Sequence, residues 1–288
     1  MNQQHSPAHL TVVYTPGSQL RDPGRLFRHM FRDLAASREL AWRLFVRNVS
    51  ARYRQTMFGY AWAILPPIFA TLVFVFLRDT GFFNVKETKV PYPIFALAGM
   101  VLWQTFADAL NSPMRMVAGS ISMLTKINFP REALILAGIG EVLFSFLIRL
   151  VLLVVVILWF GTPVPWTIVM VPVGVLLLVA LGIAAGVLLT PLAVLYHDIE
   201  QALPVLTSLL MFLAPVVYPP PEVSRGSLMM TLNPVSPVLD TTRAWLLTGS
   251  PEHLTGFIAV SVMTLALLFV GWTLYRLALP LLIERMSA

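Results

Sequence analysis

Basic side chains recur at helical spacing just before the first long apolar run of the chain. On a helix that begins near Glu39, one stripe consists of Arg43, Arg47, Ser50 and Arg54. The neighbouring stripe is apolar and aromatic: Trp42, Val46, Val49, Tyr53 and Met57. Guanidinium groups placed this way meet anionic lipid headgroups while the aromatic stripe enters the acyl boundary. The pattern therefore favours a helix in the membrane interface; the alternative is a positive flank that only fixes topology.

Charged residues also fall inside long apolar runs. Glu141 and Arg149 are eight residues apart, which places them about 80° apart on one helix and about two turns along it. Charges at bilayer depth are costly and mark either a transport pathway or an internal ion pair. We favour pairing with neighbouring helices over a proton relay, because no chain of acidic residues crosses the other runs. Asp108, with Gln104 and Asn111, gives another run a polar inner end that we expect to face protein or a water-filled cavity.

Hydrolytic and metal sites have no counterpart in the sequence. Each of the three lysines follows Val or Thr, so the Gly-Lys pair of a phosphate loop does not occur. The motifs H-E-x-x-H and G-x-S-x-G do not occur either, and there are no cysteines. We therefore expect no catalytic residue, no metal and no cofactor bound by this chain.

The composition identifies the elements that must position these residues. The 288 residues are 57% hydrophobic and only 12% charged, with a mean hydropathy of +0.78. A soluble domain carries about 25% charged residues. Most of the net charge of +6 lies beside the first apolar run, which indicates anionic lipid rather than nucleic acid as its partner. The first 20 residues lack the apolar core of a signal peptide.

The apolar runs predict an all-α integral membrane protein with six transmembrane helices. The expected spans are about 58–78, 93–111, 133–160, 167–190, 201–218 and 254–280. They form a membrane domain at 58–280, between a cytoplasmic segment with amphipathic helices at 1–57 and a cytoplasmic tail at 281–288. Fourteen of the twenty Lys and Arg residues then lie on the inside, which places both termini in the cytoplasm.

Three local features refine this picture. Pro66 and Pro67 lie inside the first span and predict a kink there. Gly182 and Gly186 form a G-x-x-x-G pattern that permits close approach of another helix without identifying it. The segment 219–253 is interpreted as short helices that dip back toward the membrane, with a plain loop as the alternative.

Aromatic residues on the first two spans could stack against sugar rings. More often such residues form an interfacial belt or face lipid. The candidates for a translocation pathway are Trp62, Phe69, Phe74, Trp103 and Phe106, together with the carboxylate of Asp108.

Four stretches of the chain together resemble one family of transporter subunits. They are Arg52–Thr56 with Gly59–Ala63 and Pro66-Pro67, then Lys126–Glu132, Tyr196–Ile199 and Asn233–Pro237. The resemblance is to the permease subunits of ATP-binding-cassette type 2 exporters, most closely the polysaccharide branch with O-antigen permeases of the Wzm type, capsule permeases and teichoic acid permeases. It covers about residues 38–280. The chain departs from that pattern in its N-terminal extension and in His197, where an arginine before the aspartate is usual.

The resemblance implies a homodimer that works with two copies of a separate ATPase, which would hold ATP and magnesium. It implies export of a lipid-linked polysaccharide, most closely O-antigen, across the bacterial inner membrane, with the outer segment gating the exit. It assigns ATPase contacts to the interfacial helix, with Arg52 facing the ATPase or the second protomer. The further ATPase contacts would be Lys126, Asn128, Phe129, Pro130, Arg131 and Glu132, with His197 and Asp198 on the same face. Arg43, Arg47 and Arg54 would meet the pyrophosphate of the lipid carrier.

Two other functions remain open from the sequence. A type 2 permease for a small drug or lipid would have the same architecture. A proton-coupled secondary transporter would work alone, through Glu141 and Arg149. A membrane enzyme is the weakest alternative, because no convergent site is visible.

Overall fold

The computed structural model describes residues 32–54, 57–82, 88–124, 129–219, 233–251 and 253–287. Every regular element in these ranges is a helix, which confirms the all-α prediction. The amphipathic helix expected after Asp22 lies mostly outside the described residues, as do Lys126 and Asn128.

Within the described ranges, four helices are long and apolar enough to cross a membrane. They are α5 (Tyr92–Ala118), α7 (Glu132–Trp159), α8 (Val171–Leu195) with the 3-10 turn η2 (Trp166–Met170) before it, and α12 (Leu254–Ser287), counted to Leu279. At about 1.5 Å per residue, α5 is about 40 Å long, more than the roughly 30 Å of hydrocarbon. They match the expected spans at 93–111, 133–160, 167–190 and 254–280.

The other two expected spans correspond to shorter helices. The first is α4 (Leu65–Asp79), which follows a 3-10 turn, η1 (Gly59–Ala63). The second is α9 (His197–Leu210), continued by the 3-10 turn η3 (Met211–Leu213). Fifteen residues of α-helix cover only about 22 Å. The count of six spans therefore stays a prediction.

The double proline acts differently from the prediction. Pro66 and Pro67 lie in the first turn of α4, and the 3-10 turn before them is separated from it by Ile64. Proline fits the first turn because the backbone N–H that it lacks has no partner there. The prediction of a kink within one continuous helix is therefore wrong. The helix is interrupted at Ile64, and α4 begins directly after it.

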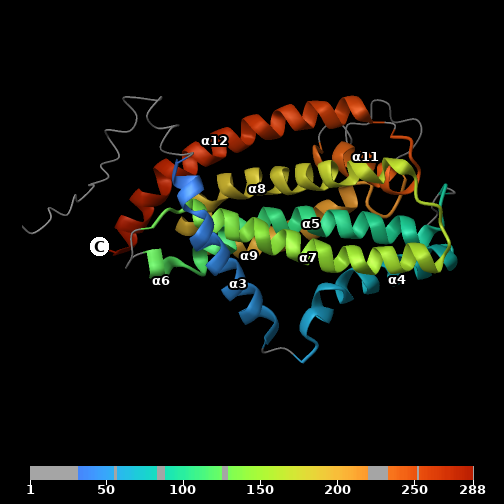
Figure 1. Cartoon of the computed structure of the whole chain (residues 1–288), viewed down its shortest axis with the longest axis horizontal. Helices are drawn as coiled ribbons and strands as arrows, with labels where there is room; N and C mark the ends of the chain where they lie inside the picture. The colour runs from blue at the N-terminus through green and yellow to red at the C-terminus, as the bar shows by residue number, and fades with distance from the viewer. Residues whose placement is uncertain are drawn as a thin grey trace, which may run out of the picture.

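Helix α5 forms the centre of the bundle and packs against α4, α7, α8 and α11 (Val235–Leu247) (Figure 1). The G-x-x-x-G pattern of α8 makes one of these contacts. A Cβ atom added to Gly182 would come within 2.6 Å of the Ala109 Cβ, and one added to Gly186 within 2.3 Å of the Leu110 carbonyl oxygen. The close approach expected from the pattern is confirmed, and its partner is α5.

The outer segment contains a helix, α11 (Val235–Leu247), of which ten of thirteen residues are buried. It packs against α5, α8 and α12. Arg243 anchors it: this buried guanidinium donates to the carbonyl oxygens of Pro215 and Val216 at 2.8 and 3.1 Å, and pairs with Asp240 at 2.7 Å. It also lies 3.8 Å from the ring centre of Phe95 on α5. A packed helix thus replaces the plain-loop alternative.

Helix α3 (Arg38–Arg54) crosses the bundle beside α7 at the end where α5 and α8 finish and α7 begins, at the left of Figure 1. We call this the expected cytoplasmic end, and the end that holds α11 the expected outer end. The chain then reverses and returns through η1 into α4, which runs toward the expected outer end (Figure 1). This reversal creates the space described next.

Candidate functional site

Helix α3 has three faces rather than two. The arginine stripe is exposed at Arg43 and Arg47, and so are Trp42 and Val46 on the aromatic stripe. A third face, with Ala41 and Leu44 buried on it, packs against α7. Neither stripe that the sequence revealed is the one that holds the helix to the protein.

The packed face also carries a polar contact. Asn48 donates from Nδ2 to Oε1 of Glu141 on α7 at 2.8 Å. The other oxygen of Glu141 lies 3.5 Å from an Arg115 nitrogen on α5. The Glu141 side chain is only 8% exposed, so these two groups satisfy a carboxylate that would be costly to bury alone. The prediction that Glu141 pairs with neighbouring helices is confirmed.

Arg149 pairs with a different helix. Its Nη2 lies 2.7 Å from Oδ2 of Asp108 on α5, and its Nε donates to the carbonyl oxygen of Ala63 in η1 at 3.3 Å. Asp108 and Arg149 each lie ten residues before the end of their helix, about 15 Å along the axis. The ion pair therefore lies in the middle part of two long apolar helices. The prediction that Arg149 pairs with a neighbouring helix is confirmed.

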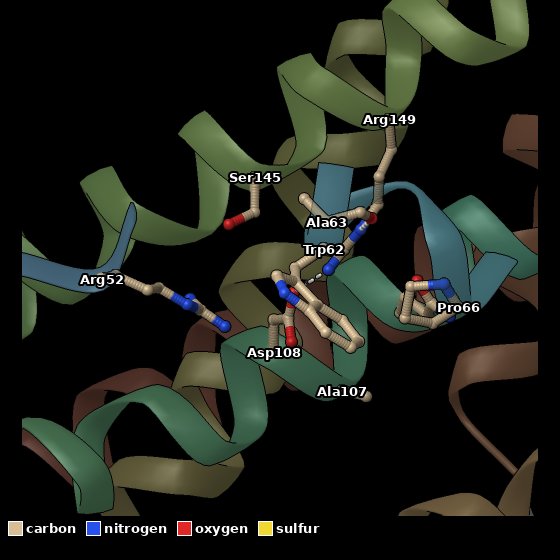
Figure 2. Close-up of a pocket in the computed structure, with 9 residues that line it drawn as sticks. Arg52, Trp62, Ala63, Pro66, Ala107, Asp108, Ser145 and Arg149 are labelled. Atoms are coloured by element: carbon tan, nitrogen blue, oxygen red, sulfur yellow. Dashed lines mark hydrogen bonds and ion pairs between the residues drawn. The ribbon is translucent and has the colours of Figure 1, made fainter. Parts of the chain in front are cut away.

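The pair borders a cavity of about 320 Å³ where α3, η1, the start of α4, α5 and α7 meet (Figure 2). Such a volume could hold on the order of ten water molecules, at about 30 Å³ each. The predicted polar inner end of α5 faces this cavity through Gln104 and Asp108. The lining residues are Arg52, Trp62, Ala63, Pro66, Gln104, Ala107, Asp108, Ser145 and Arg149.

Arg52 reaches the cavity because of its position on α3. It follows Asn48 by four residues and Leu44 by eight, so it continues the face that packs against α7. Figure 2 shows its side chain extending from α3 into the space between Ser145 and Asp108. Arg52 belongs to neither of the two stripes recognised in the sequence, and the packed face of α3 explains its position.

Two buried polar atoms at the cavity have no hydrogen-bond partner among the described residues: Nη1 of Arg149 and Oε1 of Gln104. Arg149 is 7% exposed. A buried donor without an acceptor costs about 1–3 kcal/mol, and more when the group is charged. Both atoms are therefore polar groups that the described structure leaves buried and unsatisfied.

A second charged cluster lies at the expected cytoplasmic end. Arg276 of α12 pairs with Asp33 and, at 3.3 Å, with Glu132 at the start of α7. The hydroxyl of Tyr275 donates to the Arg131 carbonyl oxygen at 3.4 Å. Burial lowers the pKa of Arg131, while Tyr275 and Glu132 oppose that shift. We call Asp33, Arg131, Glu132, Tyr275 and Arg276 the end cluster.

The expected ATPase-contact residues differ in exposure. Glu132 is buried within the end cluster, whereas Phe129, Pro130 and Arg131 are partly exposed and Asp198 is exposed. His197 begins α9. Their contact with an ATPase stays a prediction. No sequence pattern singled out Asp33 or Arg276, because their partners are far away along the chain.

The expected pathway aromatics also separate into groups. Trp62 lines the cavity and Phe69 is exposed. Trp103 and Phe106 are buried, with ring centres 5.5 Å apart, and Phe74 is buried near Phe212. Within this chain these three rings belong to the hydrophobic core, so a pathway role for them would require that core to open.

No group of three His, Asp or Glu side chains that could hold a metal ion occurs in the part of the chain that the structure describes. The polar groups that line the cavity include two guanidinium groups, one carboxylate and the amide of Gln104. Such a set can bind an anion or a polar head group.

Comparison with known proteins gives relatives of similar length. The O-antigen export system permease protein RfbA of Myxococcus xanthus is 26% identical over 251 residues, which cover 86% of this chain and 95% of that protein. A protein of the same name from Klebsiella pneumoniae is 22% identical over 72% of this chain and 80% of its own length. The polysialic acid transport protein KpsM of Escherichia coli is 21% identical over 81% and 91%.

The model of one protein family, the ABC-2 type transporter, matches residues 39–247. The match begins at α3 and ends with α11, so it includes the cavity and every element that lines it. Together with four membrane-length apolar helices, it shows that this chain belongs to the ABC-2 type transporter family.

Proposed function

We propose that this chain is the transmembrane subunit of an ABC transporter that exports a lipid-linked polysaccharide, with O-antigen as the leading candidate. The observation that carries the proposal is the set of relatives matched over most of their length, which are named for O-antigen export and polysialic acid transport. The substrate class is taken from those names. The membrane would be the bacterial inner membrane, with both termini in the cytoplasm.

A separate ATPase would supply the energy. The sequence contains no phosphate loop, and family members of this kind work with an ABC ATPase. We propose that a homodimer of this chain binds two copies of the ATPase. The ATPase copies would hold ATP and magnesium. Six helices are few to enclose a polymer, so a channel between two protomers is the simpler geometry.

The end cluster offers a route for the mechanical coupling. It joins Arg131 and Glu132 at the start of α7 to α12 and, through Asp33, to the residues just before α3. An ATPase that pressed on the segment around Phe129–Arg131 would therefore move α3, α7 and α12 together. The arginine stripe would meet the carrier pyrophosphate at the membrane surface, because guanidinium groups bind phosphate oxygens in forked geometry.

Deletion of the gene in its host tests the proposal. We expect surface polysaccharide to be lost and lipid-linked polymer to accumulate inside the cell. Restoration should require this chain and its ATPase with an intact phosphate-loop lysine; an ATPase variant that lacks this lysine is the control. Transport by the purified chain with no ATPase would instead establish a secondary transporter, and an unchanged surface polymer would favour a small drug or lipid as substrate.

A further inference from the structure

The cavity beside α3 has an excess of positive charge. Arg52 and Arg149 line it with Asp108 as the sole acidic residue among its nine lining residues. Figure 2 shows the two arginines approaching from different sides, Arg52 from α3 and Arg149 from α7. Two guanidinium groups and one carboxylate therefore border the cavity.

Arg149 is held in place yet keeps a donor free. Asp108 accepts from Nη2 and the Ala63 carbonyl accepts from Nε, so the guanidinium plane is fixed by two helices and η1. Nη1 has no partner in the described structure, and the side chain is more than nine-tenths buried. Of the five N–H donors of an arginine, the outer pair on Nη1 remains for a ligand.

We propose that this cavity is an intermediate binding site for a phosphate-bearing head group, and that Arg52 and Arg149 are its ligands. The inference rests on the proposed function, which requires the phosphate group of a lipid carrier to pass the membrane. A phosphate oxygen can accept from Nη1 of Arg149 while Arg52 supplies the second cation, an arrangement that suits the forked guanidinium better than a single lysine.

The depth of the site indicates what it does. Asp108 and Arg149 lie in the middle part of α5 and α7, away from both ends, where an anion has no headgroup region to interact with. The cavity lies beside Trp62 and Pro66, both exposed, with exposed Phe58 and Phe69 nearby in the chain. A lipid chain can remain on that apolar side while its head group is bound.

Asp108 gives the site its reversibility. Without a ligand, its carboxylate keeps Arg149 paired and ordered. A phosphate group competes with this carboxylate for the same guanidinium, so the head group is bound without being trapped. This exchange makes the cavity a transit site rather than a storage site.

The test measures binding to the purified full-length chain in detergent micelles. The probe is geranylgeranyl pyrophosphate, compared with geranylgeraniol, which lacks the phosphates, and with inorganic pyrophosphate. We expect the pyrophosphate lipid to bind at least tenfold more tightly than the alcohol. Arg52→Gln should weaken its binding about tenfold, as should the double variant Asp108→Asn/Arg149→Gln, which removes both members of the ion pair together. Arg38→Gln, an exposed arginine at the start of α3, is the matched control and should stay within twofold.

Each outcome decides the inference. Equal binding by Arg52→Gln and Arg38→Gln overturns it, as does equal binding of the lipid and the alcohol. Inorganic pyrophosphate that binds as tightly, with the same dependence on Arg52, supports a phosphate site but assigns it to a soluble anion. If the gene restores export while Arg52→Gln binds normally, only this inference fails. If the binding pattern holds but export does not depend on the gene, only the proposed function fails.

Discussion

The arginine stripe of α3 and the arginines of the cavity are two cationic regions with opposite surroundings. On the stripe, Arg43 pairs with Glu39 of its own helix, and both side chains are more than 70% exposed. In the cavity, Arg149 is buried and joins α7 to α5 and η1. Exposed charges are nearly free to change, because water replaces each lost partner. A buried charge such as Arg149 is costly to change, because its partners would be left without a counter-charge away from water.

The difference also separates what each region can do for transport. A flexible exposed stripe can collect anionic head groups at the membrane surface. A fixed guanidinium with one free donor can bind a head group in a defined position. The following predictions test this division, first through the free energy of unfolding and then through export.

The largest effect is expected for Arg149→Gln. The change leaves the Asp108 carboxylate without its cation in a mostly buried position, which should lower the free energy of unfolding by about 3 kcal/mol. Titration of the purified chain with a denaturing detergent measures this loss. The double variant Asp108→Asn/Arg149→Gln should recover most of it, and strictly additive losses would show that the ion pair does not couple α5 to α7.

A smaller effect is expected for Asn48→Ala. The variant removes the 2.8 Å hydrogen bond to the buried Glu141 carboxylate, and hydrogen bonds to charged groups contribute about 1.5–3 kcal/mol. The same titration measures it. Ser50→Ala, exposed two residues later, is the control and should change stability by less than about 0.5 kcal/mol. Equal losses in both variants would contradict the assignment of the anchoring face of α3.

The smallest effect on stability is expected for the triple change of Arg43, Arg47 and Arg54 to Gln. Exposed ion pairs contribute about 0.2–1 kcal/mol at most, so the chain should remain folded and in the membrane. Polysaccharide export should nevertheless fall, as measured by surface polymer per unit of membrane-bound chain. Unchanged export would reduce the stripe to a topology signal.

Much of this arrangement could be predicted from the sequence, because hydropathy and charge report directly on the membrane. Four spans, the close packing at Gly182 and Gly186, and pairing of Glu141 and Arg149 with other helices followed from local patterns. The partners did not, since Asp108 is 41 residues from Arg149 and only the fold brings them together. The same limit hid the contact of Asp33 with Arg276.

Other errors have physical causes that periodicity does not encode. The two stripes recognised on α3 did not include Arg52, although its spacing from Leu44 and Asn48 aligns it with a third face of the helix. Trp103 and Phe106 were interpreted as pathway, interfacial-belt or lipid-facing residues, and their place in the core was missed because large aromatic side chains are common in all of these environments. Pro66 and Pro67 are compatible with a kink or a helix start, and the 3-10 turn before them decided for the start.

The anchoring of α11 constrains how the expected outer end can open. The Arg243 guanidinium is held by two carbonyl oxygens of the segment after η3, by Asp240 and by the face of Phe95. Asp240 lies on α11 itself, so lifting α11 alone would strip this buried cation of the two carbonyl oxygens and of the Phe95 ring at once. We therefore expect α11, α5 and the segment around Val216 to move as one rigid block. In the proposed homodimer, the hinge of an exit gate would then lie outside this block, and the gate would open along the boundary between the protomers rather than at the α5–α11 contact.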